Sequence, residues 1–449
     1  MRYPSRAADD VRMRGFAHRH TVEAALGWLD AQLQPLDAED VPVRHAAGRV
    51  LATSVVSPVD VPGFDRATMD GYALIAESTE GASAYNRLLL TVIGDSMPGC
   101  PFDGSVSAGQ AVRVMTGAPM PRGADAVLPA EWVEAESNCT ESNSISPLAA
   151  VSPEKNVGRR GEDIRSGATL LERGRVLRPQ DLGVLSSIGQ GCVRIVRRPR
   201  VRLVVTGNEL LPSGSRPQGF QIADANGPML AALIERDGGV VDFPGLVRDD
   251  SDAILEALEA DADVIVVTGG SSVGIEDLAP MLVAQLGELA VHGIAMRPSS
   301  PTGLGRIGHR LVFLLPGNPV SALCAYDFFA GRAIRALGGR SKAWPYRTVR
   351  GALTRKISSQ IGRLDYARVR LADGQGRKTT SDAEACAHSE KAAWKDGCSQ
   401  DWLPHKVEPL AIAGASVLSS TTRADGFVIV CDDSEGFAAG AEVEVWMYD

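Results

Sequence analysis

Apolar runs of strand length alternate with helical patterns from about residue 199 to residue 342. The runs are continuous, as in strands that are buried on both faces. Between them, apolar residues recur at helical spacing, as at Ile254, Leu255 and Leu258. This alternation predicts a doubly wound parallel sheet with helices on both faces. The expected strands are 200–206, 240–246, 263–268, 291–296 and 311–315, and the expected helices are 224–236, 251–260, 277–286 and 319–337.

Shorter patterns flank this region on both sides. Apolar residues on one face, after a threonine suited to capping, predict a helix over 21–33. Residues 61–163 are rich in Gly, Pro and Ser with short β-like runs, and they predict a small β-rich domain. After residue 343 the helical patterns stop, and short strand patterns predict a terminal, barrel-like β-domain. The chain is therefore expected to be an α/β multidomain protein.

The expected domain boundaries follow from these changes of pattern. A helical and β-containing linker domain, to which we also assign dimerisation, is expected to combine two separate stretches of the chain. The polar stretch inside the terminal domain lacks periodicity and is expected to be an exposed insertion. The expected parts are a flexible tail 1–17, a linker domain 18–60 with 164–198, a β-rich domain 61–163, a doubly wound domain 199–342 and a terminal domain 343–449 with its insertion at 373–406.

Composition narrows the function classes. The chain has 449 residues, which is too long for one core, and a formal net charge of −9, which disfavours nucleic-acid binding. Seven cysteines are scattered without a CxxC pair, so neither a zinc site nor a disulfide frame is indicated. The longest apolar runs are strand-sized and the N-terminus lacks a signal pattern. We expect a cytoplasmic protein with no nucleic-acid or membrane partner.

The strand expected at 263–268 ends in a candidate phosphate-binding loop. Gly269, Gly270, Ser272 and Gly274 follow the strand, and the next helix is expected to begin at Asp277. Glycines let backbone N–H groups approach an oxyanion, and a helix N-terminus adds its dipole. A plain strand-to-helix turn fits the same residues, and the loop alone does not decide between the two interpretations.

Other strand ends add polar residues to the same expected edge of the sheet. Glu209 and Asp249 follow two of the strands, and Asp277 follows a third. Several carboxylates beside a phosphate repel it unless a cation intervenes, and Asp277 is placed to hold a divalent cation that bridges to a phosphate. Another strand leads into a tight turn and a helix with polar and proline residues at its start. These residues are Pro316, Asn318, Pro319 and Ser321.

Six different short sequence strings follow one another along the chain. In the front half they contain Asp70, Thr116 and Asp163, which taken singly are ordinary polar loop residues. The strings are MDGYA (69–73), MTGAP (115–119), RRGEDI (159–164), TGNEL (206–210), GGSSVGIED (269–277) and LPGNPVS (315–321). Together they resemble the molybdopterin molybdenumtransferase family, which includes MoeA and the gephyrin E-domain, over roughly residues 20–345.

The resemblance implies an elongated homodimer of four-domain subunits with a molybdopterin-binding, MogA-like sheet domain. It implies a metal-dependent reaction in which adenylylated molybdopterin and molybdate give molybdenum cofactor and AMP. For this reaction we assign Asp249 and Asp277 to Mg²⁺. Each cleft is expected to combine the sheet domain of one subunit with front-half loops of the other. The positions that match family residues linked to activity are Asp70, Thr116, Asp163, Glu209, Asp249 and Asp277, and those that match the cleft lining include Ser272, Pro316 and Pro319.

The chain departs from the family where molybdate is expected to bind. A Lys-Pro-Gly-Lys-Pro stretch is usual in the family, and residues 297–301 here read Arg-Pro-Ser-Ser-Pro. Arg297 keeps a charge and Ser300 loses one, while Gly293 stands for a further lysine and Asn208 for an aspartate. Arg297, Ser299 and Ser300 are candidates to rebuild the pocket, and the loss of two local positive charges equally predicts weak molybdate affinity. Terminal-domain candidates to assist them are Arg363 or Arg368, and Ser416.

Two alternatives to molybdate insertion stay open on the sequence alone. One is molybdopterin adenylyltransferase activity, which uses a similar sheet domain but normally lacks the front and terminal β-domains. The other is a non-catalytic scaffold or diverged paralogue, which the altered 297–301 stretch favours and the retained acids disfavour. The adenylyltransferase that supplies the substrate is also a candidate protein partner. Tungstate resembles molybdate in charge and shape, and the sequence does not distinguish them.

Overall fold

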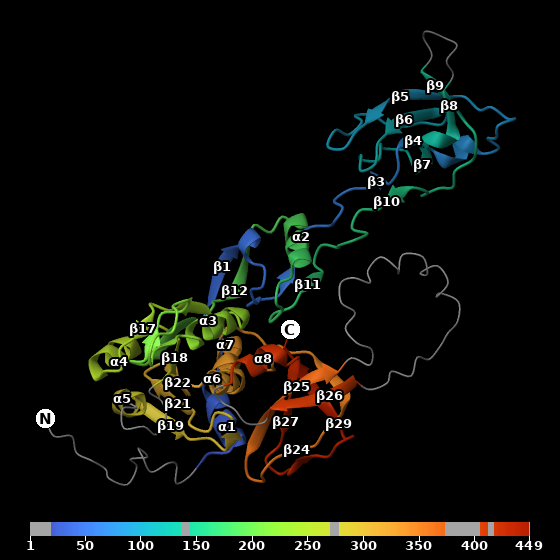
Figure 1. The fold of residues 1–449 in the computed structure, drawn as a ribbon. Coiled ribbons are helices and arrows are strands. Elements are labelled where there is room, and N and C mark those ends of the chain that lie inside the picture. Colours follow the sequence, from blue (N-terminus) through green and yellow to red (C-terminus); the bar gives the residue numbers. More distant parts are fainter. Residues whose placement is uncertain (1–18, 136–142, 270–277, 373–404, 412–416, 449) are drawn as a thin grey trace. The chain divides into compact units, whose positions relative to one another are not determined.

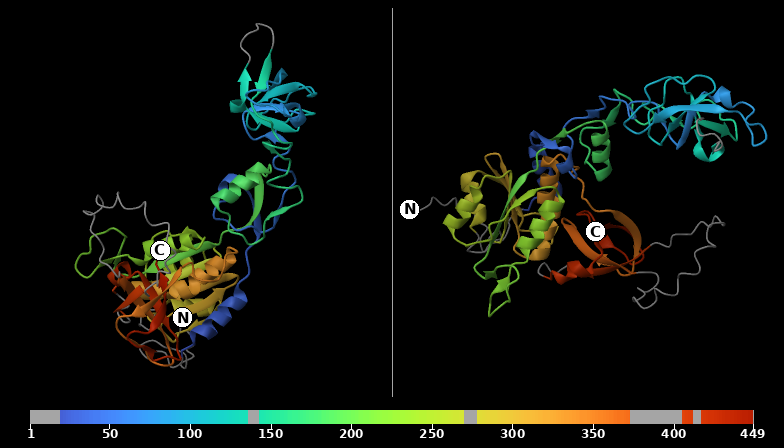
Figure 2. Two further views of the ribbon diagram at one scale, coloured as in Figure 1. Left: turned by 90° about the vertical axis from the view of Figure 1, so that its right-hand side faces the viewer. Right: turned by 90° about the horizontal axis from the view of Figure 1, so that it is seen from above.

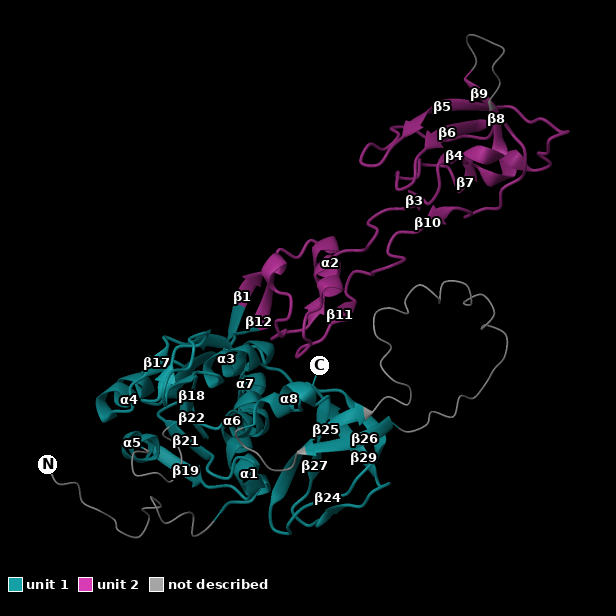
Figure 3. Ribbon diagram, viewed as in Figure 1, with its two compact units in different colours: residues 1–39, 196–449 teal, residues 40–195 magenta. Residues whose placement is uncertain are grey.

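The computed structural model describes residues 19–135, 143–269, 278–372, 405–411 and 417–448. The chain folds into two compact units, which Figure 3 shows in different colours. Unit 2 comprises residues 40–195 and is inserted in sequence between the two parts of unit 1, residues 1–39 and 196–449. The predicted tail and most of the predicted insertion lie outside the described residues, and the finer domain boundaries stay predictions.

A mixed β-sheet forms the larger part of unit 2, as the glycine-rich strand patterns predicted. Apolar residues point to both faces: Ala73 and Val112 pack on one side, and Leu74 and Leu128 on the other. The strands in spatial order are β7 (Ala126–Pro129), β4 (Gly71–Leu74), β6 (Gln110–Val114), β5 (Leu90–Ser96), β9 (Ser144–Pro147) and β8 (Val133–Ala135). The short elements beside it are β3 (Arg66–Ala67), its partner β10 (Val157–Gly158), η2 (Ala76–Thr79) and η3 (Ala130–Trp132).

A second, smaller core in unit 2 surrounds one helix. Leu171, Leu177 and Leu185 are buried there together. The helix begins with Pro179, a favoured first residue because its missing N–H needs no partner there. The elements are η1 (Val43–His45), β2 (Val55–Val56), β11 (Thr169–Leu171) and α2 (Pro179–Ser187), with the strand pair β1 (Ala38–Pro42) and β12 (Cys192–Val196) where the chain passes between the units.

Unit 1 contains the expected parallel sheet, and it adds antiparallel strands at one edge. The strands in spatial order are β16 (Val240–Asp242), β13 (Arg200–Thr206), β18 (Val264–Thr268), β22 (Arg310–Leu315), β21 (Gly303–Ile307) and β19 (Glu288–His292), with β17 (Leu246–Val247) also on β13. Strands β13, β16, β17, β18 and β22 run parallel. Strand β21 is antiparallel to both of its neighbours.

The single strand predicted over 291–296 was wrong. The chain leaves β19 at His292 and turns at Gly293, whose φ of 88° suits glycine. It then forms β20 (Met296–Arg297) in a different sheet. Strand β21 was not predicted, because its two glycines weaken a strand pattern. The glycines are needed there, since a Cβ on Gly305 would lie 2.3 Å from the carbonyl oxygen of Glu288.

Helices cover both faces of this sheet (Figure 1). Val264 and Val266 of β18 face one set of helices, and Ile265 and Val267 face the other. The first set is α1 (Val22–Gln32), α3 (Asn226–Arg236), α6 (Pro319–Ala325) and α7 (Gly331–Leu337), and the second is α4 (Ser251–Leu258) and α5 (Ala279–Leu286). Thr21 caps α1 as predicted, accepting a hydrogen bond from Ala24 N at 3.1 Å. The helix expected over 319–337 is present, with a π-helical segment η4 (Tyr326–Ala330) between α6 and α7.

The C-terminal part of unit 1 is a closed five-stranded barrel, drawn in orange to red in Figure 2. Each strand pairs with two others of the set, in the order β25 (Leu364–Ala372), β26 (His405–Ala411), β23 (Thr348–Leu353), β29 (Glu442–Met447) and β27 (Gly426–Val430), which returns to β25. Val369, Val407 and Val445 fill its interior. Short elements complete it: β24 (Ile357–Ser358), β28 (Gly436–Phe437) and α8 (Ser419–Arg423).

The barrel is fixed to the α/β part of unit 1 in two ways. Strand β20 pairs with β25, so Arg297 lies opposite Asp365. An aromatic cluster also joins them, with Trp344 packed edge-on against Phe328, Phe427 and Trp446. Among the described helices, none is both long and apolar enough to span a membrane.

Candidate functional site

Three loops of unit 1 meet at the carboxyl ends of neighbouring strands. Val205 of β13 lies opposite Thr268 of β18, which lies opposite Leu315 of β22, so the residues that follow these strands share one edge. Gly269 stands there with φ 89°, and a Cβ on it would lie 2.1 Å from the carbonyl oxygen of Thr206. Only glycine fits this position. In open parallel sheets this edge is where ligands bind.

A side chain that the motifs did not single out ties these loops together. Asn226, the first residue of α3, donates from Nδ2 to Thr268 Oγ1 at 3.0 Å and to the Gly317 carbonyl at 2.7 Å. The Thr268 hydroxyl donates in turn to the Pro316 carbonyl at 3.2 Å. The strand ends are thus held by buried hydrogen bonds. From the sequence, Asn226 was only a polar residue near the start of an expected helix.

Of the three acidic residues predicted for this edge, the structure describes Glu209 and Asp249. Glu209 is exposed, and its Oε2 lies 2.9 Å from the position of a Cβ on Gly207. Asp249 is half-buried after β17, and its neighbour Asp250 caps α4 by accepting from Ala253 N at 3.0 Å. Asp277, Gly270, Ser272 and Gly274 lie outside the described residues. The described residues contain no group of three or more acidic, histidine or cysteine side chains that would hold a metal, so the pair Asp249 and Asp277 stays a prediction.

The start of α6 contacts the segment 297–301. Pro319 occupies the first turn, and Asn318 takes the capping position without a capping hydrogen bond from its side chain. Ser321 is buried, and its carbonyl accepts from Ser299 Oγ at 2.5 Å. The hydroxyl of Ser300 is enclosed without a hydrogen bond among the described residues. The segment is therefore held against α6 by Ser299.

Arg297 is bound to the barrel. Its Nη2 lies 2.5 Å from Oδ2 of Asp365, a fully buried carboxylate that also accepts from Arg363 Nε at 3.0 Å and from Ser359 Oγ at 2.9 Å. Two guanidinium groups thus share one carboxylate and leave a net positive charge. Of the other residues expected to assist in the oxyanion pocket, Arg368 is fully buried and Ser416 lies outside the described residues.

In unit 2 the structure brings two predicted residues into contact. Asp70 Oδ1 accepts from the backbone N of Thr116 at 2.7 Å and from its hydroxyl at 2.8 Å. These hydrogen bonds hold the pKa of the Asp70 carboxyl below its usual value. The carboxylate is therefore kept ionised and oriented at the unit's surface.

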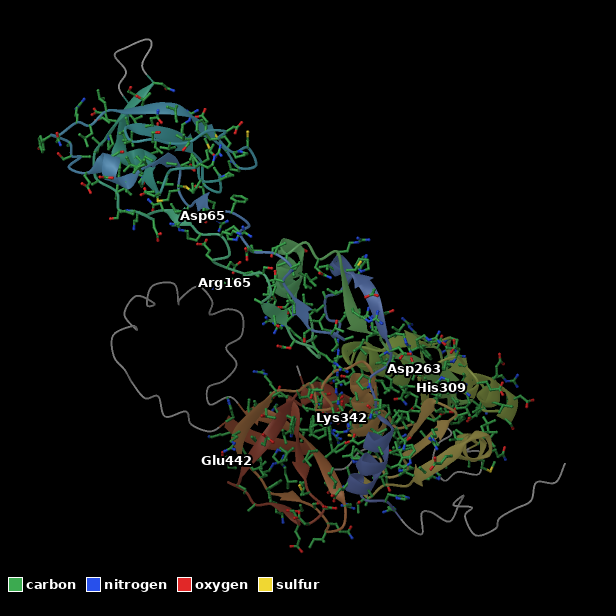
Figure 4. The ribbon with its side chains drawn as sticks, turned by 180° about the vertical axis from the view of Figure 1, so that it is seen from behind. Asp65, Arg165, Asp263, His309, Lys342 and Glu442 are labelled. Atoms are coloured by element: carbon green, nitrogen blue, oxygen red, sulfur yellow. The ribbon has the colours of Figure 1, made fainter. Side chains whose placement is uncertain are left out.

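Asp163, the third predicted residue of unit 2, is exposed, and its backbone N donates to the Val61 carbonyl at 3.1 Å. An ion-pair network lies in the same loops. Asp65, labelled in Figure 4, accepts from Arg159 at 2.6 Å and from the backbone N of Arg160 at 2.9 Å. These bonds lower the pKa of Asp65 against the opposing effect of burial, the backbone bond most.

Three family models match long stretches of the chain. The MoeA N-terminal region (domains I and II) matches residues 20–189, a probable molybdopterin binding domain matches 202–336, and the MoeA C-terminal region (domain IV) matches 405–448. A molybdopterin molybdenumtransferase 2 from Mycobacterium tuberculosis is 33% identical over 90% of this chain and 94% of its own. A molybdopterin molybdenumtransferase from Haemophilus influenzae is 33% identical over 74% of this chain and 81% of its own.

Solved structures agree with these matches. Two crystal structures of a molybdopterin biosynthesis MoeA protein from Pyrococcus horikoshii give TM-scores of 0.75 and 0.71. They are 32% and 30% identical in sequence, and each comparison covers 96% of this chain and at least 99% of the other. The similarity therefore includes the β-rich front region, the sheet domain and the terminal barrel together.

Proposed function

This chain belongs to the MoeA family of molybdopterin molybdenumtransferases, a family of molybdenum-cofactor biosynthesis, and we propose that it inserts molybdate into adenylylated molybdopterin with release of AMP. The observation that carries the proposal is the meeting of three strand-end loops at Thr206, Gly269 and Gly317. This edge is preorganised by buried hydrogen bonds, and the carboxylate of Glu209 lies near Gly207 beside it. Such an edge suits a phosphorylated heterocycle.

The residues around this edge have separate proposed roles in binding the substrate. The backbone at Gly269 and Gly317 approaches the substrate closely because neither residue carries a Cβ. Glu209 and Asp249 offer only hard oxygen ligands, which fit Mg²⁺, a cation that needs few protein ligands beside substrate phosphates. We assign Asp249 with Asp277 to that ion, which when bound would neutralise charge on the phosphoanhydride. Ordered side chains at this edge then orient the substrate.

The oxyanion site is proposed at the junction of β20 and the barrel. Arg297 and Arg363 share Asp365, so their net charge of +1 attracts a dianion such as molybdate. The enclosed Ser300 hydroxyl adds a donor on the same segment. In this set Arg297 stands where the family usually has a lysine, and the two planar guanidinium groups present fixed pairs of donors.

We propose that Asp70, Thr116 and Asp163 act in the site of a homodimer. They belong to unit 2, and we propose that unit 2 of one copy completes the site on the sheet of the other copy. The adenylyltransferase that makes the substrate is proposed as a transient partner. Both proposals rest on the family's organisation.

The test is AMP release from adenylylated molybdopterin, with and without Mg²⁺ and molybdate. Asp249→Asn is expected to lower turnover by about 10- to 1,000-fold, because it removes a charged ligand of the proposed ion. Asp250→Asn is the matched control. It removes the neighbouring charge but keeps a good capping residue for α4, so turnover should stay near wild type.

Three outcomes would count against the proposal. These are AMP release that is independent of molybdate, an Asp249→Asn enzyme as active as the control, and pyrophosphate release from ATP and molybdopterin. The last result would instead indicate adenylyltransferase activity.

A further inference from the structure

Two polar atoms at the strand-end edge are buried without a hydrogen bond to any described residue. Thr206 is 3% exposed and Asn226 is 7% exposed. Thr206 Oγ1 and Asn226 Oδ1 nevertheless have no partner in the part of the chain that the structure describes. Leaving such atoms unpaired is unfavourable, so each occurrence calls for an explanation. Both side chains lie on the loops that meet at Gly269, because Thr206 contacts Gly269 and Asn226 bonds the neighbouring Thr268.

The orientation of the Asn226 amide is fixed by its partners. The Gly317 carbonyl, 2.7 Å away, can only accept, so the group that faces it must be the NH₂. The second amide hydrogen goes to the Thr268 hydroxyl, whose own hydrogen goes to the Pro316 carbonyl. Both donors are therefore used inside the protein. The oxygen that remains is an acceptor only.

An acceptor-only atom discriminates between parts of a substrate. Phosphate and molybdate oxygens are themselves acceptors at neutral pH, and they would be repelled by Asn226 Oδ1. A ring amino or lactam N–H would pair with it. The Thr206 hydroxyl can rotate to donate to a ring nitrogen or carbonyl beside that N–H. The two residues together match a heterocycle edge that presents a donor next to an acceptor.

We propose that Thr206 and Asn226 bind the N–H-bearing edge of a heterocycle in the substrate, and that the phosphates lie elsewhere along the loops. The pterin and the adenine of the adenylylated substrate both have such an edge, so the identity of the ring rests on the proposed function. Neither residue belongs to the acids and prolines that the sequence motifs indicated. They are specificity-determining residues whose effect is on binding of the ring.

The decisive variant is Thr206→Val in the full-length chain. It has nearly the same shape and removes a hydroxyl that makes no hydrogen bond within the described residues, so the melting temperature of the ligand-free protein should stay the same or rise. Thr268→Val is the matched contrast. It removes a hydroxyl that bonds both Asn226 and Pro316, so the melting temperature should fall. Thr348→Val, at an exposed strand position, controls for the substitution itself.

Binding is measured by calorimetry with AMP, with inosine monophosphate, with a pterin and with pyrophosphate. Thr206→Val should weaken the binding of the ring-bearing ligand about 3- to 10-fold and leave pyrophosphate binding unchanged. A loss confined to AMP identifies the adenine as the ring, in which case inosine monophosphate should bind wild type less well. A loss confined to the pterin identifies the pterin.

Two results would overturn the inference. One is an equal loss of pyrophosphate binding, and the other is unchanged binding of every ring-bearing ligand. Because binding is measured without turnover, these results are independent of whether the chain releases AMP.

Discussion

Asp327 is a fully buried carboxyl in the helical segment η4. Arg236 lies 3.3 Å from it, and the Tyr346 hydroxyl donates to it at 3.0 Å. Burial nevertheless raises the pKa of Asp327 to about 6, helped by the nearby charge of Asp237 and opposed by Arg236. Removal from water therefore outweighs the partial pairing with Arg236. The consequence is a specific pH dependence of stability.

Because the folded state keeps the Asp327 proton up to about pH 6 and the unfolded state releases it near its ordinary value of 3.8, this carboxyl stabilises the fold most below pH 4. That contribution is lost as pH rises to about 6. Asp327→Asn cannot titrate. The unfolding free energy of wild type should therefore fall relative to this variant, by up to about 3 kcal/mol between pH 4 and 6 at about 1.4 kcal/mol for each pKa unit.

Urea denaturation at several pH values measures this difference. Asp242→Asn is the control and should follow wild type, because this carboxylate is exposed although its partner Arg202 is not. A difference between wild type and Asp327→Asn that does not change with pH would refute the prediction.

Gly269 is the residue at which backbone geometry constrains the site most closely. Gly269→Ala would place a methyl group against the Thr206 carbonyl in a left-handed conformation, so it should lower the unfolding free energy by about 2–4 kcal/mol. Gly308→Ala is the matched control. It has a similar positive φ but open space around it, so it should cost only about 1 kcal/mol. Equal losses in the two variants, measured by urea denaturation, would mean that no close contact exists at Gly269.

Sequence patterns predicted some residues of the site and missed others for a physical reason. Gly269, Pro316 and Asp249 were indicated because a strand end followed by glycine, proline or acid is visible locally. Asn226 and Asp365 were missed, because their roles depend on partners far along the chain. The orientation of the Asn226 amide is decided by the Gly317 carbonyl, and Asp365 acts by joining Arg297 to Arg363.

At the scale of elements, the pairing of β20 with β25 determines the charge at the proposed oxyanion site. The sequence did not predict this pairing, because a two-residue strand carries no periodicity. The chain leaves the α/β sheet after β19 and adds β20 to the barrel strand β25. Arg297 is thereby placed opposite Asp365, and the positive charge at this site depends on the barrel as much as on the 297–301 segment.

Asp365→Asn tests this junction. The variant removes a buried carboxylate that pairs two guanidiniums, so it should destabilise unit 1 by about 1–3 kcal/mol, less than a fully buried pair because Arg297 and Arg363 are 33% and 27% exposed. Asp433→Asn, at an exposed position near the barrel, should leave stability unchanged. The measurement is thermal unfolding, and a melting temperature equal to that of the control would argue against the network.

At the scale of the whole molecule, the candidate residues are divided between the two units. Asp70 and Thr116 belong to unit 2, and the strand-end loops belong to unit 1. If sites form between two copies, an Asp70→Asn enzyme and an Asp249→Asn enzyme are each inactive but complement one another. Random mixing of the two by refolding should restore about one quarter of wild-type AMP release, since half of the dimers are mixed and each mixed dimer has one intact site.

Each variant mixed with itself is the control and should stay inactive. No recovery in the mixed sample, with mixed dimers shown to be present by differently tagged copies, would mean that each copy uses its own unit 2.

The insertion of unit 2 also sets an order of events during synthesis on the ribosome. Helix α1 precedes unit 2 in the chain, but its apolar residues Ala25 and Leu29 belong to the same core as α6 and α7, which are made much later. Unit 2 is continuous in sequence and can fold as soon as it emerges, because domains generally fold as units. The apolar face of α1 therefore stays uncovered until the rest of the sheet domain has been translated. That interval is when the nascent chain is most open to chaperone binding.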